Sequence, residues 1–295
     1  MDCHHTFSYP PSAQMQLSVI TDEISQDFEH ALDVMLEYDV RAAELRGLWN
    51  VNIGDLTEPL AVRAKKALKA RGVKVSCLST PIFKCDLFTD SSEAKGPMHL
   101  ATARGLEEQQ DLLMRCIRWA HWFDTPLLRI FTFWRQGAVT PEIEKRIVEA
   151  LNNIIPIAEK EGVILALENE HACFIGTGEE TRHLVSQLQS PALQVCWDAG
   201  NAFFAGERPY PDGFHAVKPW LKHIHIKDAY RNADGKPVWC VVGEGEIDYV
   251  GQFAELKEMN YTGYLSLETH YIPDGGTSEA GSRACLAAMK RMIKD

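Results

Sequence analysis

Residues 163–201, VILALENEHACFIGTGEETRHLVSQLQSPALQVCWDAGN, contain the pattern that decides the fold. An apolar run, Val163–Glu168, is followed by an amphipathic stretch, Thr181–Gln189, and then by a second apolar run, Leu193–Asp198. Short apolar runs are typical of buried strands, and Ser190-Pro191 ends the helix-like stretch between them. The segment therefore predicts a strand, a helix and a second strand parallel to the first.

The same alternation extends over the rest of the chain. Six further strand candidates are Gln16–Thr21, Ala42–Arg46, Lys74–Ser79, Leu127–Phe131, Leu221–Ile226 and Gly263–Glu268. Further helix-like stretches are Phe28–Tyr38, which Ser25 or Asp27 can cap, Pro59–Arg71 and Thr140–Glu161. Gly72 and Gly162 follow the last two and are good helix-ending residues. We expect Pro156 to kink or split the third stretch.

Eight strand–helix units favour closure into a (β/α)₈ TIM barrel, an α/β fold that commonly forms one domain of about 250 residues. The alternative is an open, doubly wound sheet, which usually has a glycine-rich turn after its first strand. Here the first strand leads into Asp22-Glu23-Ile24 without glycine. We therefore expect a single barrel domain over residues 15–295, preceded by a flexible tail over residues 1–14.

Composition excludes several classes of function. The chain has 295 residues and a net charge of −11, whereas nucleic-acid binders usually present a basic face. No apolar run is long enough to cross a bilayer, and the first residues lack the features of a secretory signal. The eight cysteines include no CxxC pair, so we expect reduced, buried thiols. A cytoplasmic protein is expected, with its oligomeric state left open.

Four side chains with metal-ligand chemistry end four consecutive strand candidates. They are Glu168, Asp198, His225 and Glu268. All strands of a barrel direct their carboxyl ends to one face, where active sites are built. Three carboxylates in one place raise each other's pKa unless a cation is present. Oxygen ligands with one imidazole favour Mn²⁺, Mg²⁺ or Co²⁺, with Zn²⁺ also possible, so we expect one divalent ion, with Mn²⁺ first.

Several residues near these strand ends are candidates for substrate contacts. His223 and Lys227 share the strand parity of His225; we expect His223 to be structural and the Lys227 ammonium to reach the site. The remaining candidates at this stage are Glu44, Trp134, His171, Asn201 and His270. Trp134 could stack on a sugar or pack in the core, and Glu44 could simply pair with Arg46. The long connection Pro81–Gly96 is either a lid on the catalytic face or a surface loop.

Seven short motifs resemble the xylose isomerase-like barrel superfamily, in its sugar-phosphate isomerase and epimerase branch. They span most of the chain: DEIS at 22–25, AELRG at 43–47, LENEH at 167–171, WDAGN at 197–201, HIHIKD at 223–228, GEGEID at 243–248 and GYLSLE at 263–268. The resemblance to ketose 3-epimerases implies that Glu168 and Glu268 bind metal and also move protons. It also implies that Arg231 contacts substrate. Those epimerases carry a substrate-binding histidine where this chain has Asn201, so their particular sugar is not implied.

Endonuclease IV shares this barrel but needs extra histidines for three zinc ions. The corresponding positions here hold Cys77, Ser79, Arg129, Phe131, Asn201 and 237–239 (PVW). A trinuclear site therefore cannot form, which together with the acidic charge argues against DNA repair.

The combined reading predicts a metal-dependent isomerase or epimerase acting on a small keto-sugar or polyol carbonyl. The metal would stabilise an enediolate while Glu168 and Glu268 act as catalytic acid and base. Dehydration of a keto-cyclitol or keto-sugar by a carbon–oxygen lyase needs the same proton removal and is the alternative. A non-catalytic, metal-stabilised sugar-binding barrel is a third possibility.

Overall fold

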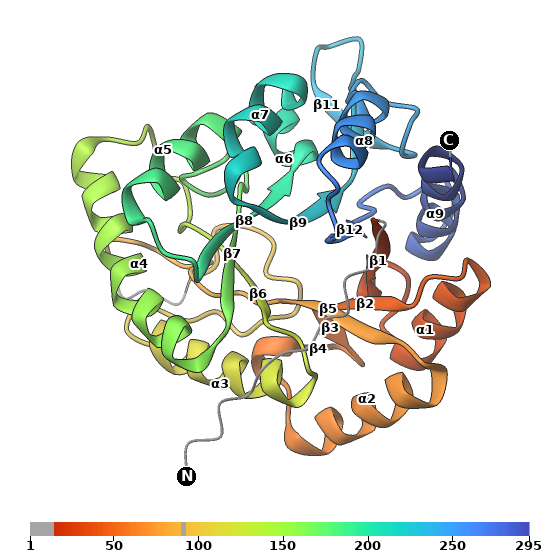
Figure 1. Ribbon diagram of the computed structural model, residues 1–295, viewed down its shortest axis with the longest axis horizontal. Helices are drawn as coiled ribbons and strands as arrows, with labels where there is room; N and C mark the ends of the chain where they lie inside the picture. Colours follow the sequence, from red (N-terminus) through yellow and green to blue (C-terminus); the bar gives the residue numbers. More distant parts are fainter. Residues whose placement is uncertain (1–14, 90–92, 295) are drawn as a thin grey trace.

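Eight short parallel strands form the centre of the molecule and helices surround them (Figure 1). The computed structural model describes residues 15–89 and 93–294. The barrel strands are β1 (Gln16–Ile20), β2 (Ala42–Leu45), β5 (Lys74–Ser79), β6 (Leu127–Ile130), β7 (Ile164–Glu168), β8 (Leu193–Asp198), β9 (Leu221–Ile226) and β12 (Tyr264–Leu267). They close in the order β1-β12-β9-β8-β7-β6-β5-β2, which confirms the TIM barrel.

Helices follow the barrel strands and cover them from outside (Figure 1). They are α1 (Phe28–Glu37), α2 (Glu58–Arg71), α3 (Gln109–Trp122), α4 (Pro141–Glu161), α5 (Gly178–Leu188), α6 (Ala199–Phe204), α7 (Phe214–Val217), α8 (Tyr249–Glu258) and α9 (Ser278–Lys294). Short helical turns span Thr21–Glu23, Ile53–Asp55, Pro209–Gly213 and Lys218–Trp220. Two small antiparallel hairpins are β3 (Gly47–Leu48) with β4 (Val51–Asn52), and β10 (Asp228–Arg231) with β11 (Pro237–Cys240).

Local sequence signals explain where the helices begin and end. Asp27 caps α1 by accepting a hydrogen bond from the His30 amide, as one of the two predicted caps. Gly72 and Gly162 end α2 and α4 in the left-handed conformation, with φ of 63° and 69°, as their positions predicted. Helix α5 begins at Gly178, earlier than expected, because Thr177 and Glu180 form a capping box there.

Helix α4 runs unbroken through Pro156, so this proline does not split it. Pro156 is exposed, and so is Asn152 one turn earlier. The Asn152 carbonyl, which loses its amide partner at a proline, therefore faces water that can hydrogen-bond to it.

The apolar core lies between the strands and the helices, whereas the barrel interior holds polar side chains. Buried polar residues include Ser18, Ser76, Glu44, Arg129 and His223. Ser18 and Ser76 hydrogen-bond to each other at 2.6 Å between Oγ atoms. None of the seven described cysteines forms a disulfide bond, and all seven are buried, as expected. Over the described residues, no helix has the length and apolar character needed to cross a membrane.

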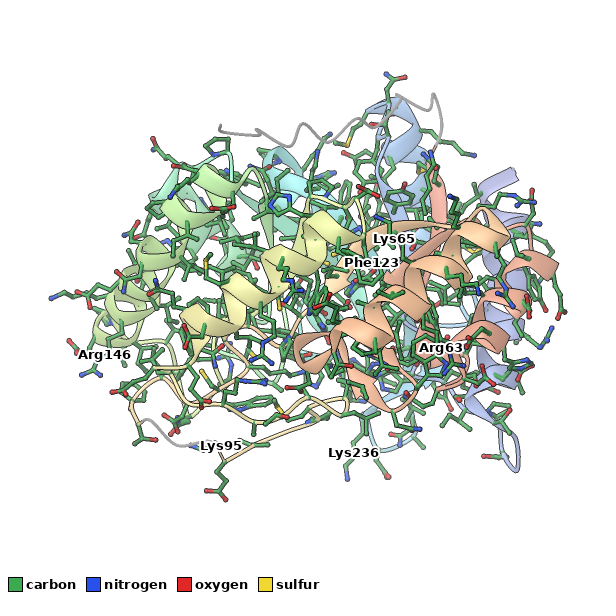
Figure 2. The ribbon with its side chains drawn as sticks, turned by 90° about the horizontal axis from the view of Figure 1, so that it is seen from below. Arg63, Lys65, Lys95, Phe123, Arg146 and Lys236 are labelled. Atoms are coloured by element: carbon green, nitrogen blue, oxygen red, sulfur yellow. The ribbon has the colours of Figure 1, made fainter. Side chains whose placement is uncertain are left out.

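Two long insertions flank the end of the barrel at which the strands finish. Lys95, in the connection after β5, and Lys236, in the turn between β10 and β11, lie at the same end of the molecule (Figure 2). Most side chains from Pro81 to Leu87 are buried, so the first half of the predicted lid packs into the protein. The remainder of that segment includes residues 90–92, which lie outside the described residues, as does the predicted tail over residues 1–14.

Candidate metal centre

The four predicted ligand residues meet at one point inside the barrel mouth. Glu168 ends β7, Asp198 ends β8, His225 lies near the end of β9, and Glu268 directly follows β12. These strands are neighbours in the barrel. One possible ligand atom from each of the four residues lies within 4.8 Å of every other, and all four side chains are buried. The structure therefore brings together the set that the sequence placed on successive strand ends.

The imidazole of His225 faces the three carboxylates with one nitrogen. Its Nδ1 lies 3.4 Å from Glu168 Oε1, 3.8 Å from Asp198 Oδ2 and 3.5 Å from Glu268 Oε2. Its other nitrogen, Nε2, lies 2.9 Å from Glu44 Oε1. When Nε2 carries the ring hydrogen and donates it in a hydrogen bond to Glu44, Nδ1 of the neutral ring keeps its lone pair. Glu44 therefore orients His225 for the carboxylate side.

Glu44 lies on the far side of His225 from the carboxylates. It also contacts His223, with 2.7 Å between Oε2 and Nε2, and accepts a hydrogen bond from Ser79 Oγ. With both oxygens engaged and no exposed surface, Glu44 supports the imidazoles and does not face a substrate. The expected pairing of Glu44 with Arg46 is wrong, because Glu44 points toward β9 and Arg46 points toward the ends of β1 and β12.

Three cations surround the carboxylate group. Arg129 donates to Glu168 Oε2 at 2.6 Å, and Arg46 donates to Glu268 Oε1 at 2.9 Å. Both guanidinium groups hold outer oxygens and leave the inner oxygens directed at His225. Lys227 does reach the site, as strand parity predicted: its Nζ lies 2.7 Å from Glu268 Oε2 and 3.0 Å from Asp198 Oδ2.

The electrostatics separate the carboxylates. Burial opposes ionisation of Glu168, yet Arg129 and His225 hold the pKa of that carboxyl below its ordinary value. Burial likewise opposes ionisation of Glu268, whose pKa lies well below its ordinary value beside Lys227 and His270. Burial raises the pKa of Asp198 to about 7, against the opposing effect of Lys227. Asp198 is thus the carboxylate whose charge the protein compensates least.

The donor set fits a divalent cation. Asp198 Oδ2 is buried and accepts no hydrogen bond of good geometry from any residue that the structure describes; its cationic neighbour is Lys227 Nζ at 3.0 Å. A buried carboxylate oxygen without a well-formed hydrogen bond has a lone pair that a metal ion can use. Three carboxylates and one imidazole are ligands that Mn²⁺, Mg²⁺ and Co²⁺ accept. The buried cluster is consistent with a divalent metal site.

The other substrate candidates lie at different depths. Asn201 is buried and links the ligand residue Glu168 to His171. Its amide nitrogen donates to Glu168 Oε1 at 2.9 Å, and its Oδ1 lies 2.9 Å from His171 Nδ1. His171 has 37% of its side chain exposed, so it lies at the rim. Arg231 is exposed on β10, stacked at 4.7 Å over the Phe203 ring, and does not contact the cluster.

Trp134 does not present an open aromatic face. It is 1% exposed and packs with Phe131 and Cys173 in a small apolar cluster. Gly96 of the long connection lies against its ring, so close that an added Cβ would come within 2.9 Å of it. Core packing, the other expectation for this residue, is what the structure shows.

Sequence reasoning missed two cations as part of the site, Arg46 and Arg129. Arg129 carried a signal, because a charged residue inside the apolar strand LLRI needs a buried partner. Arg46 was noted but assigned the wrong partner. His270, by contrast, was a candidate, and its Nε2 lies 3.4 Å from Glu268 Oε1 with 26% of the side chain exposed.

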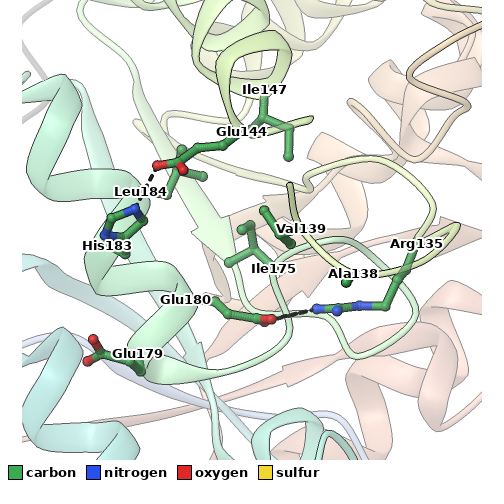
Figure 3. Close-up of a pocket in the computed structure, with 10 residues that line it drawn as sticks. All are labelled: Arg135, Ala138, Val139, Glu144, Ile147, Ile175, Glu179, Glu180, His183 and Leu184. Atoms are coloured by element: carbon green, nitrogen blue, oxygen red, sulfur yellow. Dashed lines mark hydrogen bonds and ion pairs between the residues drawn. The ribbon is translucent and has the colours of Figure 1, made fainter. Parts of the chain in front are cut away.

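A separate pocket of about 430 Å³ lies outside the barrel, where α4 and α5 begin (Figure 3). Arg135 and Glu180 on its lining form an ion pair at 2.9 Å, and Glu144 lies 2.7 Å from His183. None of the four clustered ligand residues lines it. The charged groups in these two pairs bind one another. No described polar side-chain atom on this lining is buried without a hydrogen bond, as Asp198 Oδ2 is in the barrel.

Comparison with known proteins supplies the family. The profile for the xylose isomerase-like TIM barrel matches residues 32–292. An inosose dehydratase of Clostridium perfringens is 25% identical over 146 residues, which cover 44% of this chain and 48% of that protein. The chain thus spans about half the length of the curated relatives that it matches.

Two solved structures share the fold over nearly their whole lengths. A probable 3-DHS dehydratase involved in petrobactin synthesis, from Bacillus anthracis, has a TM-score of 0.73 and 18% identity, covering 94% of this chain and 99% of that chain. A D-allulose 3-epimerase from Methylomonas sp. has a TM-score of 0.69 and 14% identity, covering 95% and 98% respectively. At these identities the likeness concerns the fold.

Proposed function

The chain belongs to the xylose isomerase-like TIM barrel family, and from that premise we propose that it is a metal-dependent carbon–oxygen lyase. Its substrate would be a small hydroxylated ketone, such as a keto-cyclitol or keto-sugar, from which it removes water. The curated relatives named inosose dehydratase favour this activity over the isomerase or epimerase that the motifs first suggested. The order of the two hypotheses is therefore reversed.

One observation carries the proposal: inner oxygens of three carboxylates converge on His225 Nδ1, at 3.4 to 3.8 Å, in a fully buried cluster. Glu168, Asp198, His225 and Glu268 would hold the metal. A divalent cation there would polarise the substrate carbonyl and stabilise negative charge on its oxygen. The surrounding protein excludes water, which strengthens every such electrostatic interaction.

Glu268 is the carboxylate best placed to remove a proton. Its neighbour His270 is partly exposed, with Nε2 3.4 Å from Glu268 Oε1, so this carboxylate lies beside a side chain that reaches solvent. Glu168 is held between Arg129 and Asn201 with no such exit, which suits a fixed ligand. We assign to Glu268 the removal of hydrogen from the carbon beside the ketone.

The reaction then balances as the loss of one water. The C–H electron pair forms the new carbon–carbon double bond as the β-hydroxyl departs, and that hydroxyl takes up a proton. Glu268 can return the proton it has taken when both groups leave from one face. Lys227, hydrogen-bonded to Glu268 at 2.7 Å, would keep the carboxylate in place during the transfer.

Epimerisation is the second candidate, and the placement of the two glutamates favours it. Glu168 and Glu268 approach from β7 and β12, with β8 and β9 between them. Carboxylates on two sides of one substrate could remove a proton from one face and return another to the opposite face. The non-catalytic sugar-binding barrel requires that neither carboxylate act.

Deuterium exchange distinguishes these functions. Protein with added Mn²⁺ would be incubated in D₂O with a panel of ketoses, aldoses and keto-cyclitols, while absorbance reports formation of an unsaturated ketone. We expect proton abstraction with water loss in wild type and neither in Glu268→Gln. Exchange with an epimer as product would replace the lyase by the epimerase. Tight sugar binding without any exchange would leave only the binding barrel.

A further inference from the structure

Lys84 is a buried cation that the proposed reaction does not yet use. It lies in the connection after β5, on the face where the strands end, and is 5% exposed. Its neighbours belong to the site: Glu170 follows Glu168 by two residues, and Phe131 follows Arg129 by two residues.

The ammonium of Lys84 has no hydrogen-bonded partner among the residues that the structure describes. The nearest carboxylate oxygen, Glu170 Oε2, lies 3.9 Å from its Nζ. Glu170 uses its other oxygen, Oε1, to contact His171 Nδ1 at 3.0 Å and to accept from the Ala172 amide at 3.1 Å, which leaves Oε2 facing Lys84 beyond hydrogen-bonding distance. The rest of the surroundings is aromatic, because Nζ lies 4.4 Å from the Phe131 ring centroid and 5.4 Å from that of Trp134.

Two further hydrogen-bond donors beside these rings also lack acceptors. Arg129 lies over the Phe131 ring with its Cζ at 4.1 Å, and its Nε is buried without a partner. The indole Nε1 of Trp134 is likewise buried and unpaired within the described part of the chain. Each of the three residues offers only donors here. The region next to the carboxylate cluster is thus short of acceptors.

A buried ammonium without an acceptor is unfavourable, and aromatic faces compensate it only in part. Lys227 shows the contrast, since its ammonium touches two carboxylates within 3.0 Å. The ammonium of Lys84, with its nearest carboxylate oxygen 3.9 Å away, is therefore free to bind an anion that arrives with a ligand. Because Arg129 itself binds Glu168 at 2.6 Å, that anion would lie a few atoms from the carbonyl held at the metal centre.

We propose that Lys84 binds an anionic substituent of the substrate, a carboxylate or a phosphate, so that the preferred substrate is an acidic hydroxylated ketone. This inference rests on the proposed function for its location, since it assumes that substrate occupies the barrel mouth. It separates the chain from enzymes whose polyol substrates are neutral.

Binding of three unreactive ring polyols tests the proposal. Isothermal titration of the Mn²⁺-loaded protein would use quinate, which carries a carboxylate, myo-inositol 1-phosphate and neutral myo-inositol. We expect wild type to bind at least one charged probe about tenfold or more tightly than myo-inositol. The Lys84→Met variant should lose that preference while its affinity for myo-inositol stays unchanged. Whichever charged probe shows the preference identifies the group.

Two controls define the outcome. Lys84→Arg keeps the charge and should keep a preference for the anion, whereas Lys95→Met removes a lysine of the same connection and should change nothing. The proposal is overturned if wild type shows no preference, or if Lys84→Met weakens all three probes alike. Because the probes lack a ketone, a failed lyase assay leaves this result intact. Conversely, a neutral ketone that exchanges deuterium normally would overturn only the role of Lys84.

Discussion

Two layers of ionisable side chains lie one above the other in this barrel, and they differ in how their charges are compensated. In the deeper layer, both oxygens of Glu44 contact imidazole nitrogens, of His223 and His225, and Ser79 adds a hydroxyl. In the upper layer, Glu168, Asp198 and Glu268 direct inner oxygens at a single imidazole nitrogen.

The comparison shows that residue type alone does not identify a reactive site. Both layers contain glutamate and histidine, but Glu44 on β2 reaches His223 and His225 on β9 across the barrel, because β2 and β9 are not neighbouring strands. In the deeper layer both Glu44 oxygens are bonded and the side chains are fully buried, although His223 Nδ1 has no partner among the described residues; we expect this layer to act by positioning His225. In the upper layer, Asp198 Oδ2 accepts no hydrogen bond of good geometry from the described residues, and the partly exposed His270 lies 3.4 Å from Glu268. We propose on these grounds that the upper layer is the one that binds and reacts.

The largest expected effect comes from exchanging the layers' histidines for alanine one at a time. His225→Ala removes one of four ligands and should lower the bound metal from about one ion per chain to a small fraction. His223→Ala should keep the metal, because His223 contacts Glu44 and none of the three carboxylates of the upper layer. Elemental analysis of the purified variants measures this. Full metal occupancy in His225→Ala would remove it from the ligand set.

The two glutamates of the upper layer should come next. Glu168→Gln and Glu268→Gln are each expected to lower turnover by at least about 10²-fold, since an amide cannot exchange a proton near neutral pH. Solvent-hydrogen exchange should fail fully in Glu268→Gln and survive in part in Glu168→Gln. Kinetics with metal content measured in parallel checks this. Normal turnover in both variants with metal bound would leave the carboxylates as ligands only.

Glu44 tests whether the deeper layer acts through His225. Glu44→Gln should weaken metal binding by about 10- to 100-fold, because a neutral amide orients and polarises the imidazole less well. Ser79→Ala, which removes another donor to Glu44, should have a smaller effect. Competition with a metal-binding dye gives both affinities. An unchanged affinity in Glu44→Gln would mean that the layers are independent.

The last prediction is that the protein does not cleave DNA. The upper layer offers ligands for one ion, and the positions that would hold a trinuclear zinc site carry residues such as Cys77, Arg129 and Asn201. Incubation with an abasic DNA duplex and Zn²⁺ should give no incision above buffer. Incision that co-purifies with the protein and disappears in Glu168→Gln would contradict this prediction.

The sequence alone determined the features that depend on neighbouring residues. Apolar runs and helix-ending glycines marked eight strands and their connecting helices, and four of the strands, β5, β7, β8 and β9, agree with prediction at the end that carries the site. The proposed ligand set followed from the same local information, because a residue that ends a barrel strand must lie at the barrel mouth. Lys227 followed from strand parity.

Only the tertiary structure decided which charges compensate one another. Glu44 meets His225 across 181 residues of sequence, and Arg46 meets Glu268 across 222. Such pairs depend on strand register, and the register shifts beside Glu44 and Cys196. Lys84 comes from a connection with no periodicity, so its burial without an acceptor could not be read from sequence. A side chain's partner is fixed by packing of distant segments, whereas its place on a strand is fixed by its immediate neighbours.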